Sequence, residues 1–437
     1  MYKKAKIGVV CLARETFDFN TAKAIYDQQK SRLIKDDTCQ WEIVEDLVIT
    51  VEDAKSAAIT LSACQVDGLV IISGTFHLGH LVLILDQAVQ RPILLWAFNE
   101  LPYDGGKIRL NSVCGINLNA SNLYKSGNDC FTCTVGDEID QTWLQAIKIK
   151  SMLRNAHVGL VGYRAHGFFN LSVDDLMIYQ KAGILIDHYE LSDVFPNLVD
   201  GLSSAPVSEV RSCYDCSQIS DAQVRKVADL THSMNRFIDK NNLDAIALRC
   251  WPEFAATYGI SPCASMSLLA ARGKTIACEG DIEGALSLLA CRAVSDEAPF
   301  FADLSQVNLE EDYALMWHCG VASPTLWDGD SMRSLDTYFA DGKGVTADFV
   351  LKSGTVTIFR IDSARSVTRA FIQKGEAIPM TKRLKGTYAK VKFGKTIREV
   401  LRIVTRTGIA HHVAMVYGDH VASFKEFARI MNYEIIE

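Results

Sequence analysis

Three residues that can bind a divalent metal each follow a short apolar run in the middle of the chain: Glu279, Asp303 and His318. Short apolar runs bounded by polar residues predict buried strands. In open parallel sheets, ligands gather outside the carboxyl ends of the strands. Two carboxylates and an imidazole at such an edge are typical ligands of Mn²⁺, Co²⁺ or Zn²⁺. The pattern therefore predicts metal-assisted chemistry on an oxygen-rich substrate.

A tandem pair, His411 and His412, precedes another apolar run, residues 413–417. Neighbouring residues of a strand point to opposite faces, so we expect at most one of the two to be a ligand. The other is expected to be a core histidine or a neighbour of the ligands.

Each of these residues also has a purely structural interpretation. Asp303 is equally suited to cap a helix, and His318 to be a buried histidine bonded to a carbonyl. Asp281 and Glu283 are well explained as acids in the first turn of a helix, where the helix dipole favours them. Glu279 is explained less well in this way, because it emerges directly from an apolar strand. The repetition of one arrangement on three strands favours the metal site.

The predicted site supports more than one chemistry. A cation held by two carboxylates and an imidazole keeps positions open for substrate oxygens. Vicinal oxygens of an open-chain sugar would chelate it, and the same carboxylates would move a proton between C1 and C2. Water held there would instead make a metallohydrolase. A non-catalytic sugar-binding protein is the third alternative, because such proteins also have two α/β domains.

Composition narrows the class of protein. The chain has 437 residues, which predicts two or three domains, and a net charge of −7. No dense basic patch is present, so we expect no nucleic-acid partner, and no apolar run is long enough to span a membrane. The first apolar run, residues 7–13, predicts a buried strand better than the core of a signal peptide. We expect a cytoplasmic enzyme.

The thirteen cysteines lie mostly inside apolar runs. An odd number scattered in this way predicts reduced thiols in a cytoplasmic protein. Two CxxC pairs, at 130–133 and 213–216, have the ligands of a structural zinc site, but they lie too far apart for zinc-finger spacing. Incidental thiols are the favoured interpretation.

The order of predicted elements indicates an α/β protein with two parallel-sheet domains and a smaller β-rich, barrel-like domain. The boundaries are expected at 1–150, 151–344, which carries the carboxylates, and 345–437, which carries the histidine pair. In the second domain we expect strands at 158–162, 184–189, 245–249, 275–278, 300–302 and 314–318. In the third we expect strands at 345–350, 354–361, 370–375, 387–391 and 403–406.

At the candidate ligands the chain resembles the L-fucose/L-arabinose isomerase family. Residues 277–286 are similar to the segment that carries the family's first metal-binding glutamate, here Glu279. The segment around Asp303 resembles that of the fucose isomerases, whereas the arabinose enzymes usually have glutamate there. His318 lies where the arabinose enzymes place a histidine ligand. His412 matches the second histidine of the family's C-terminal pair, which is the ligand.

The resemblance implies a Mn²⁺-type aldose–ketose isomerase with an ene-diol mechanism. Glu279 and Asp303 would bind the metal and serve as base and acid, His412 would complete the site, and His318 would be a fourth ligand or a hydrogen-bonding neighbour. Trp251, Trp317 and His411 are expected to border the substrate, although core packing explains either tryptophan equally well.

The resemblance does not specify the sugar. Members of the family act on 6-deoxy aldoses, pentoses and sulfoquinovose (6-deoxy-6-sulfo-glucose), and the chain is shorter than the long fucose enzymes. The resemblance also implies a homo-oligomer whose active sites are completed by neighbouring subunits.

Overall fold

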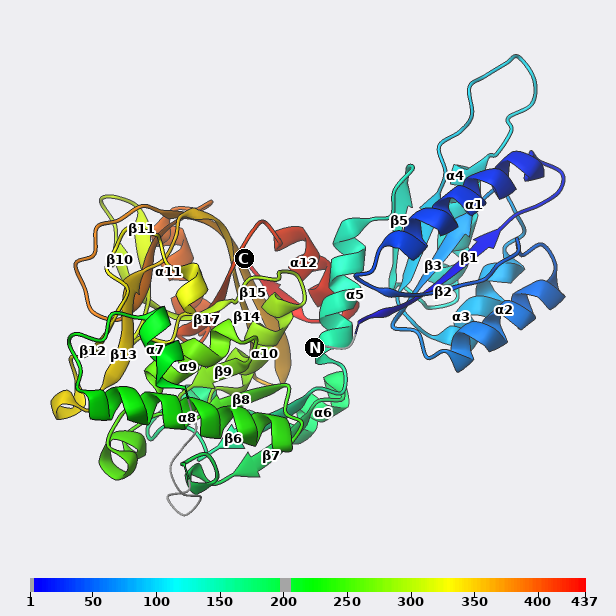
Figure 1. Cartoon of the computed structure of the whole chain (residues 1–437). Helices are drawn as coiled ribbons and strands as arrows, with labels where there is room; N and C mark the ends of the chain where they lie inside the picture. The colour runs from blue at the N-terminus through cyan, green and yellow to red at the C-terminus, as the bar shows by residue number, and fades with distance from the viewer. Residues whose placement is uncertain (1–3, 197–205) are drawn as a thin grey trace. The chain divides into compact units, whose positions relative to one another are not determined.

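The computed structural model describes residues 4–196 and 206–437 (Figure 1). Contacts divide the chain into two compact units, Met1–Met152 and Leu153–Glu437. The second unit contains both a parallel sheet and a barrel. The three-domain boundaries expected at residues 150 and 344 stay a prediction.

The first unit is an α/β domain with a five-stranded parallel sheet, in the order β2-β1-β3-β4-β5. Its strands are β1 Lys6–Leu12, β2 Gln40–Ile43, β3 Gly68–Ser73, β4 Ile93–Ala97 and β5 Phe131–Val135. The helices are α1 Phe19–Lys35, α2 Val51–Ala63, α3 His80–Val89, α4 Ser112–Lys125 and α5 Gln141–Leu153. The expected alternation of strands and helices is confirmed.

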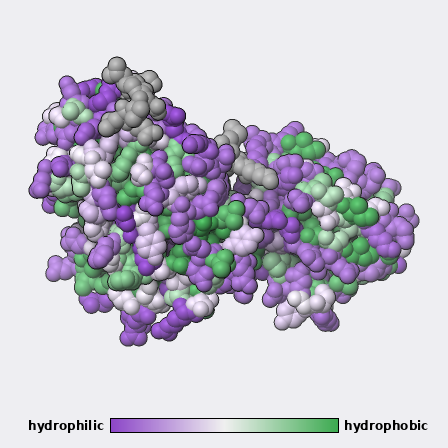
Figure 2. All heavy atoms as spheres, turned by 90° about the horizontal axis from the view of Figure 1, so that it is seen from below, coloured by the Kyte–Doolittle hydropathy of each residue, from purple (hydrophilic) through white to green (hydrophobic). Residues whose placement is uncertain are grey.

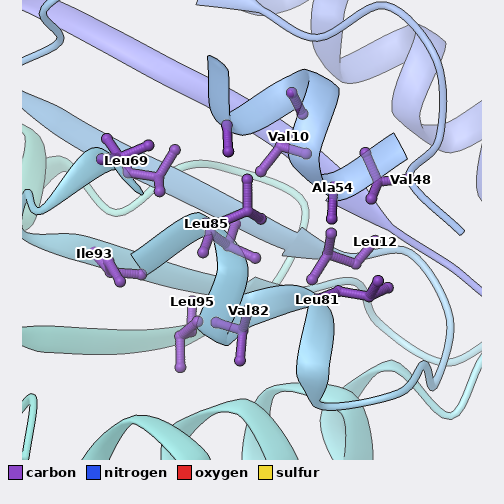
Figure 3. Close-up of a cluster of buried hydrophobic side chains, with 14 of the residues drawn as sticks. Val10, Leu12, Val48, Ala54, Leu69, Leu81, Val82, Leu85, Ile93 and Leu95 are labelled. Carbon is purple, nitrogen blue, oxygen red and sulfur yellow. The ribbon is translucent and has the colours of Figure 1, made fainter. Parts of the chain in front are cut away.

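Both faces of the three central strands, β1, β3 and β4, are buried. On one face, alternate strand residues such as Leu12, Leu69 and Leu95 pack against α2 and α3 (Figure 3). Intervening residues, among them Ile72 and Trp96, are buried as well. Burial on both faces explains why these strands read as continuous apolar runs without alternation.

The second unit begins with a four-stranded parallel sheet in the order β7-β6-β8-β9. Its strands are β6 His157–Val161, β7 Leu185–Tyr189, β8 Ala245–Leu248 and β9 Thr275–Cys278. The helices along this part of the chain are α6 Asp175–Ala182, α7 Val207–Cys213, α8 Asp221–Lys240, α9 Cys263–Ala271 and α10 Ile282–Arg292. Helix α10 follows β9 directly and packs against strands of both sheets of this unit.

The rest of the second unit is built around a closed antiparallel barrel. Six strands pair in a ring in the order β16-β11-β10-β17-β14-β15, and β15 closes it on β16. They are β10 Phe300–Asn308, β11 Tyr313–His318, β14 Gly354–Ala364, β15 Val367–Ile378, β16 Thr387–Phe393 and β17 His412–Tyr417. The remaining elements are β12 Ser334–Thr337, β13 Val345–Val350, β18 Glu434–Ile436, α11 Ile397–Thr407 and α12 Val421–Ile430. The expected fold class, parallel-sheet α/β domains followed by a β-rich barrel, is therefore confirmed.

Two predicted strands belong to the barrel and not to the parallel sheet. Strands β10 and β11 pair antiparallel with each other, and only residues 309–312 connect them. A parallel pair needs a crossover of a dozen residues or more, whereas an antiparallel pair needs only a turn. The prediction that Asp303 and His318 end strands of the parallel sheet was therefore wrong. Asp303 lies within β10, which continues to Asn308.

The strand predicted at residues 403–406 was also wrong, because these residues lie in helix α11. The helix begins with a capping box in which Thr396 and Glu399 each bond the other's backbone N–H. The apolar residues 397, 400, 401 and 404 recur at helical spacing. The β-branched residues around Ile403 suggested a strand, and the periodicity of the wider segment outweighs them.

A buried charged cluster lies between α10 and the barrel. Arg360, in the middle of β14, donates to Asp281 Oδ2 over 2.8 Å and to Asp362 Oδ1 over 3.3 Å. Arg369 pairs with Asp362. A carboxylate oxygen of Glu283 lies 3.8 Å from Arg360. Burial raises the pKa of Glu283 to about 7, although Arg360 opposes the shift. With Glu283 protonated, two arginines balance two aspartates.

The surface is mixed. On the face shown in Figure 2, hydrophilic residues predominate and hydrophobic ones form small patches. Within residues 4–196 and 206–437, no helix has the combination of length and hydrophobicity that crossing a membrane requires. None of the thirteen cysteines forms a disulfide.

Glu283 should make stability depend on pH. Its pKa rises on folding, so the folded state holds a proton that the unfolded state loses between about pH 4.5 and 7. The free energy of unfolding should fall, relative to that of Glu283→Gln, by about 2–3 kcal/mol from pH 5 to pH 8. Urea unfolding at several pH values measures this difference. Glu310→Gln, at an exposed position, is the control and should follow the wild type. A constant difference between Glu283→Gln and wild type would contradict the assignment.

Candidate active site

Glu279 lies in a tight turn between β9 and α10. Its φ is +62°, in the left-handed region that is costly for a glutamate. Gly280 follows with φ +75°, and a Cβ there would lie 2.5 Å from the Arg164 Cα. The Glu279 carbonyl accepts a hydrogen bond from the Ala165 N–H over 2.9 Å. The backbone after β6 therefore holds this turn in place, and only glycine fits at position 280.

The barrel supplies the second carboxylate and an imidazole from paired strands. Asp303 of β10 is directly opposite His412 of β17 in the antiparallel register. His412 Nε2 lies 3.1 Å from Glu279 Oε2 and 3.6 Å from Asp303 Oδ1. The carboxylates from the turn after β9 and from β10 thus meet at one nitrogen of a buried imidazole.

The charges at this point are strongly coupled. Burial alone would raise the pKa of Glu279, but interactions with the His411 and His412 imidazoles hold it well below its usual range. Burial alone would lower the pKa of His412, yet Asp281 and Glu279 raise it. A divalent cation bound by these carboxylates would oppose a positive charge on the imidazole. Glu279 is ionised at neutral pH and can act as a cation ligand.

His411 and His412 do not face opposite sides, so the strand-pleat premise was wrong, while the expectation of at most one ligand in the pair stays a prediction. Their ring centroids are 4.1 Å apart, because β17 begins at His412 and His411 lies outside the strand pleat. Their surroundings nevertheless differ. The His412 side chain is 1% exposed, whereas that of His411 is 38% exposed, with Nε2 at 3.9 Å from Glu279 Oε2. The His411 ring stacks on Phe168 at 5.5 Å.

His318 is buried beside the same group. Its Nδ1 accepts a hydrogen bond from the Cys319 N–H over 2.9 Å. A neutral imidazole that accepts at Nδ1 carries its proton on Nε2. Nε2 is buried and has no hydrogen-bond partner. This arrangement favours a hydrogen-bond donor at His318 over a metal ligand.

The two predicted tryptophans have different positions. Trp251 is 41% exposed, and its indole N–H donates to Glu279 Oε1 over 2.9 Å. Trp317 lies opposite Asp303 in the strand register and stacks on His318, but its N–H donates to the Lys385 carbonyl. Trp251 therefore contacts the Glu279 carboxylate directly, and Trp317 only flanks the site.

The donor set fits a divalent cation. Ligand atoms of Glu279, His411 and His412 lie within 4.8 Å of one another, and so do those of Asp303, His318 and His412. Asp303 Oδ1 is buried and accepts no hydrogen bond. An unsatisfied buried carboxylate oxygen is costly unless a cation or a donor meets it. Carboxylate oxygens with one imidazole suit Mn²⁺ and similar ions.

Other candidate sites fit less well. A cavity of about 360 Å³ lies beside Gly280 and is lined by Tyr163 and Arg164 among others, but none of the seven predicted site residues lines it. In the described part of the chain, neither CxxC pair belongs to a cluster of three or more metal-binding side chains.

Sequence reasoning missed several neighbours of the site. Asp281 does cap helix α10, accepting from the Gly284 N–H, but it also bonds His412 Nδ1 over 2.9 Å. Arg360 went unnoticed, although a lone arginine in the apolar run 356–361 signals a buried partner. The Phe168 segment carried no comparable signal.

The comparisons with known proteins identify the family. Residues 8–157 match the N-terminal domain of fucose/sulfoquinovose isomerases, and residues 329–437 match the C-terminal domain of L-fucose isomerase. The chain belongs to the L-fucose isomerase family. It is a sugar aldose–ketose isomerase. Family membership decides against a metallohydrolase and against a non-catalytic sugar-binding protein.

Similar curated proteins share one name. A sulfoquinovose isomerase from Priestia aryabhattai is 27% identical over 439 residues, which cover 97% of each chain. One from Alkalicoccus urumqiensis is 26% identical over 98% of each chain. One from Clostridium sp. (strain MSTE9) is 25% identical over 75% of this chain and 76% of the relative.

Trp251→Phe should separate the indole N–H from the aromatic ring. The variant keeps an aromatic face but removes the donor to Glu279, so we expect kcat/KM to fall about tenfold, the scale of a hydrogen bond to a charged group. Trp327→Phe is the control, because its N–H donates to the Ser331 carbonyl away from the carboxylates, and it should stay within twofold of wild type. Equal effects of both substitutions on isomerisation rates would refute a role for this hydrogen bond.

Proposed function

We propose that the chain is a Mn²⁺-dependent aldose–ketose isomerase acting on open-chain sulfoquinovose. The main support for metal dependence is that two carboxylate oxygens converge on His412 Nε2. Glu279 Oε2 lies 3.1 Å from this nitrogen, and Asp303 Oδ1 lies 3.6 Å from it. The names of the curated relatives support the substrate.

Glu279, Asp303 and His412 would hold the ion, which would polarise the carbonyl of the open-chain aldose. One carboxylate removes the proton from C2 as the carbonyl oxygen at C1 takes up a proton, which gives a 1,2-ene-diol. A carboxyl then returns a proton to C1 while the C2 hydroxyl loses its proton, and the ketose results. Glu279, ionised at neutral pH, is suited to the role of base, and Asp303 to that of its partner across the C1–C2 bond.

The neighbouring side chains orient the sugar. The buried Nε2–H of His318, which has no partner, would donate to a substrate oxygen. Trp251 and His411 are the exposed members of the group and would border the sugar, while the Trp251 N–H keeps the Glu279 carboxylate in place. Trp317 would contribute its ring from the edge of the site.

Two further parts of the proposal concern the whole enzyme. A homo-oligomer in which neighbouring subunits complete each site follows from the family resemblance, and light scattering of the purified protein tests it. A cytoplasmic location stays a prediction, tested by fractionation of the native cells.

An aldose panel tests the proposed reaction. Protein treated with EDTA should convert no sugar, and added Mn²⁺ should restore conversion of sulfoquinovose to its ketose, read by NMR. L-Fucose and L-arabinose, offered at the same concentration, distinguish the alternative substrates. Full activity after EDTA treatment would refute metal dependence, and conversion of L-fucose alone would refute the substrate.

Removing either carboxylate should abolish most of the activity. Glu279→Gln and Asp303→Asn preserve shape but remove the proton-transferring group, so each should lower kcat by at least about a hundredfold. Circular dichroism checks that both variants fold. Glu310→Gln serves as the control and should retain wild-type turnover. If either site variant keeps more than a tenth of the activity, its carboxylate is not the acid or base.

The three histidines should differ in their Mn²⁺ requirement. His412→Ala should need a much higher Mn²⁺ concentration for half-maximal activity, because it removes a ligand. His411→Ala should stay near wild type, and His318→Ala should fall between them. His232→Ala, at an exposed position on α8, is the control. If only His411→Ala shifted the Mn²⁺ requirement, the ligand would be His411, and its assignment to His412 would be wrong.

A further inference from the structure

We propose that Asp281 is a positioning residue for His412. Arg360 holds the Asp281 carboxylate in place, and this carboxylate holds the His412 imidazole with Nε2 directed at Glu279 and Asp303. This inference rests on the proposed metal-dependent function and adds to it a residue that touches neither the cation nor the substrate.

The hydrogen bond between the two side chains determines the tautomer of His412. Asp281 Oδ2 lies 2.9 Å from His412 Nδ1. An ionised carboxylate can only accept, so Nδ1 must carry the proton, and in the neutral imidazole Nε2 keeps its lone pair. This lone pair is the one that a metal needs. His318, whose Nδ1 accepts a backbone N–H, has the opposite preference.

Asp281 is itself held on several sides. Its Oδ1 accepts from the Gly284 N–H over 2.8 Å, and its Oδ2 accepts from Arg360 Nη1 over 2.8 Å. The side chains of Asp281 and Arg360 are both 0% exposed. Arg360 Nη1 also donates to the His412 carbonyl over 3.1 Å. One guanidinium therefore binds both the carboxylate that orients the imidazole and the backbone of the histidine itself.

The charge of Asp281 acts in the same direction as its geometry. A carboxylate bonded to the distal nitrogen of a histidine ligand raises the basicity of the ligand and restricts rotation of the ring. An asparagine in its place keeps the shape but loses the charge. Its amide can also turn its NH₂ toward Nδ1, which would put the imidazole proton on Nε2, where a ligand cannot carry it.

A purely structural role for Asp281 makes a different prediction. Asp281 caps helix α10 and neutralises Arg360, and Asp362 also neutralises Arg360. The Asp362 side chain accepts from Arg360, Arg369 and the Ala410 N–H, whereas His412 Nδ1 bonds Asp281, so Asp362→Asn is a matched control. It removes one buried anion from the same guanidinium without changing the partner of Nδ1.

Isothermal titration of the full-length, EDTA-treated protein with MnCl₂ tests the proposal. Asp281→Asn should raise the Kd for Mn²⁺ by about 10–100-fold, the usual effect of removing a carboxylate behind a histidine ligand. The Kd for Mn²⁺ of Asp362→Asn should stay within about threefold of wild type, even if its urea unfolding midpoint falls as far as that of Asp281→Asn. Equal loss of affinity in the two variants, or unchanged affinity in Asp281→Asn, would overturn the inference.

A second variant is needed if Asp281→Asn does not fold. Asp281→Asn combined with Arg360→Gln removes one buried anion and one buried cation together, so the remaining cluster stays balanced. It should show the same weakened affinity for Mn²⁺, and wild-type affinity in this variant would overturn the inference. A wild-type protein that binds no Mn²⁺ would instead overturn the proposed function, and the inference with it.

Discussion

The buried ion pair between Asp281 and Arg360 connects the two layers from which the site is built. Asp281 begins the helix that follows the last strand of the parallel sheet, and Arg360 lies in the middle of a barrel strand. Removing two charges from water is expensive, so such a pair persists only with nearly complete hydrogen bonding. Here Arg360 also donates to the His412 carbonyl, and Asp281 bonds the imidazole Nδ1 of the same residue. The register of helix and barrel is thereby linked to the position of one imidazole.

The hydrogen bonds around the turn between β9 and α10 explain why the site tolerates a strained backbone at Glu279. Glu279 has a left-handed conformation, and the next residue must be glycine because the chain after β6 passes within 2.5 Å of where a Cβ would lie. Strain of this kind lasts only where the surroundings determine it more than once. The β9–α10 turn is held by the hydrogen bond from Ala165, by the cap at Asp281 and by the indole of Trp251. The result is a carboxylate placed against the barrel and not toward solvent.

The site has a buried side and an open side, and they are suited to different tasks. His412 and His318 lie on the buried side. An unsatisfied polar atom is costly there, so a cation or a substrate oxygen that partners it would be stabilising. His411 and Trp251 lie on the open side, with enough exposure to meet a sugar. Metal binding and substrate contact can thus be provided by neighbouring residues of one histidine pair. Family membership places this arrangement in a sugar isomerase.

The amino-acid sequence by itself determined the local elements and the chemistry available to them. Apolar runs predicted the strands, and the metal-binding residue types beside those runs singled out Glu279, Asp303, His318 and the histidine pair. Local periodicity carries no information about which distant strand will be the partner. It therefore could not show that β10 and β11 belong to an antiparallel barrel, or that Asp303 faces His412 across β10 and β17. The roles of Asp281 and Arg360 were decided only by the tertiary structure, because a buried charge is defined by partners that lie far away in the chain.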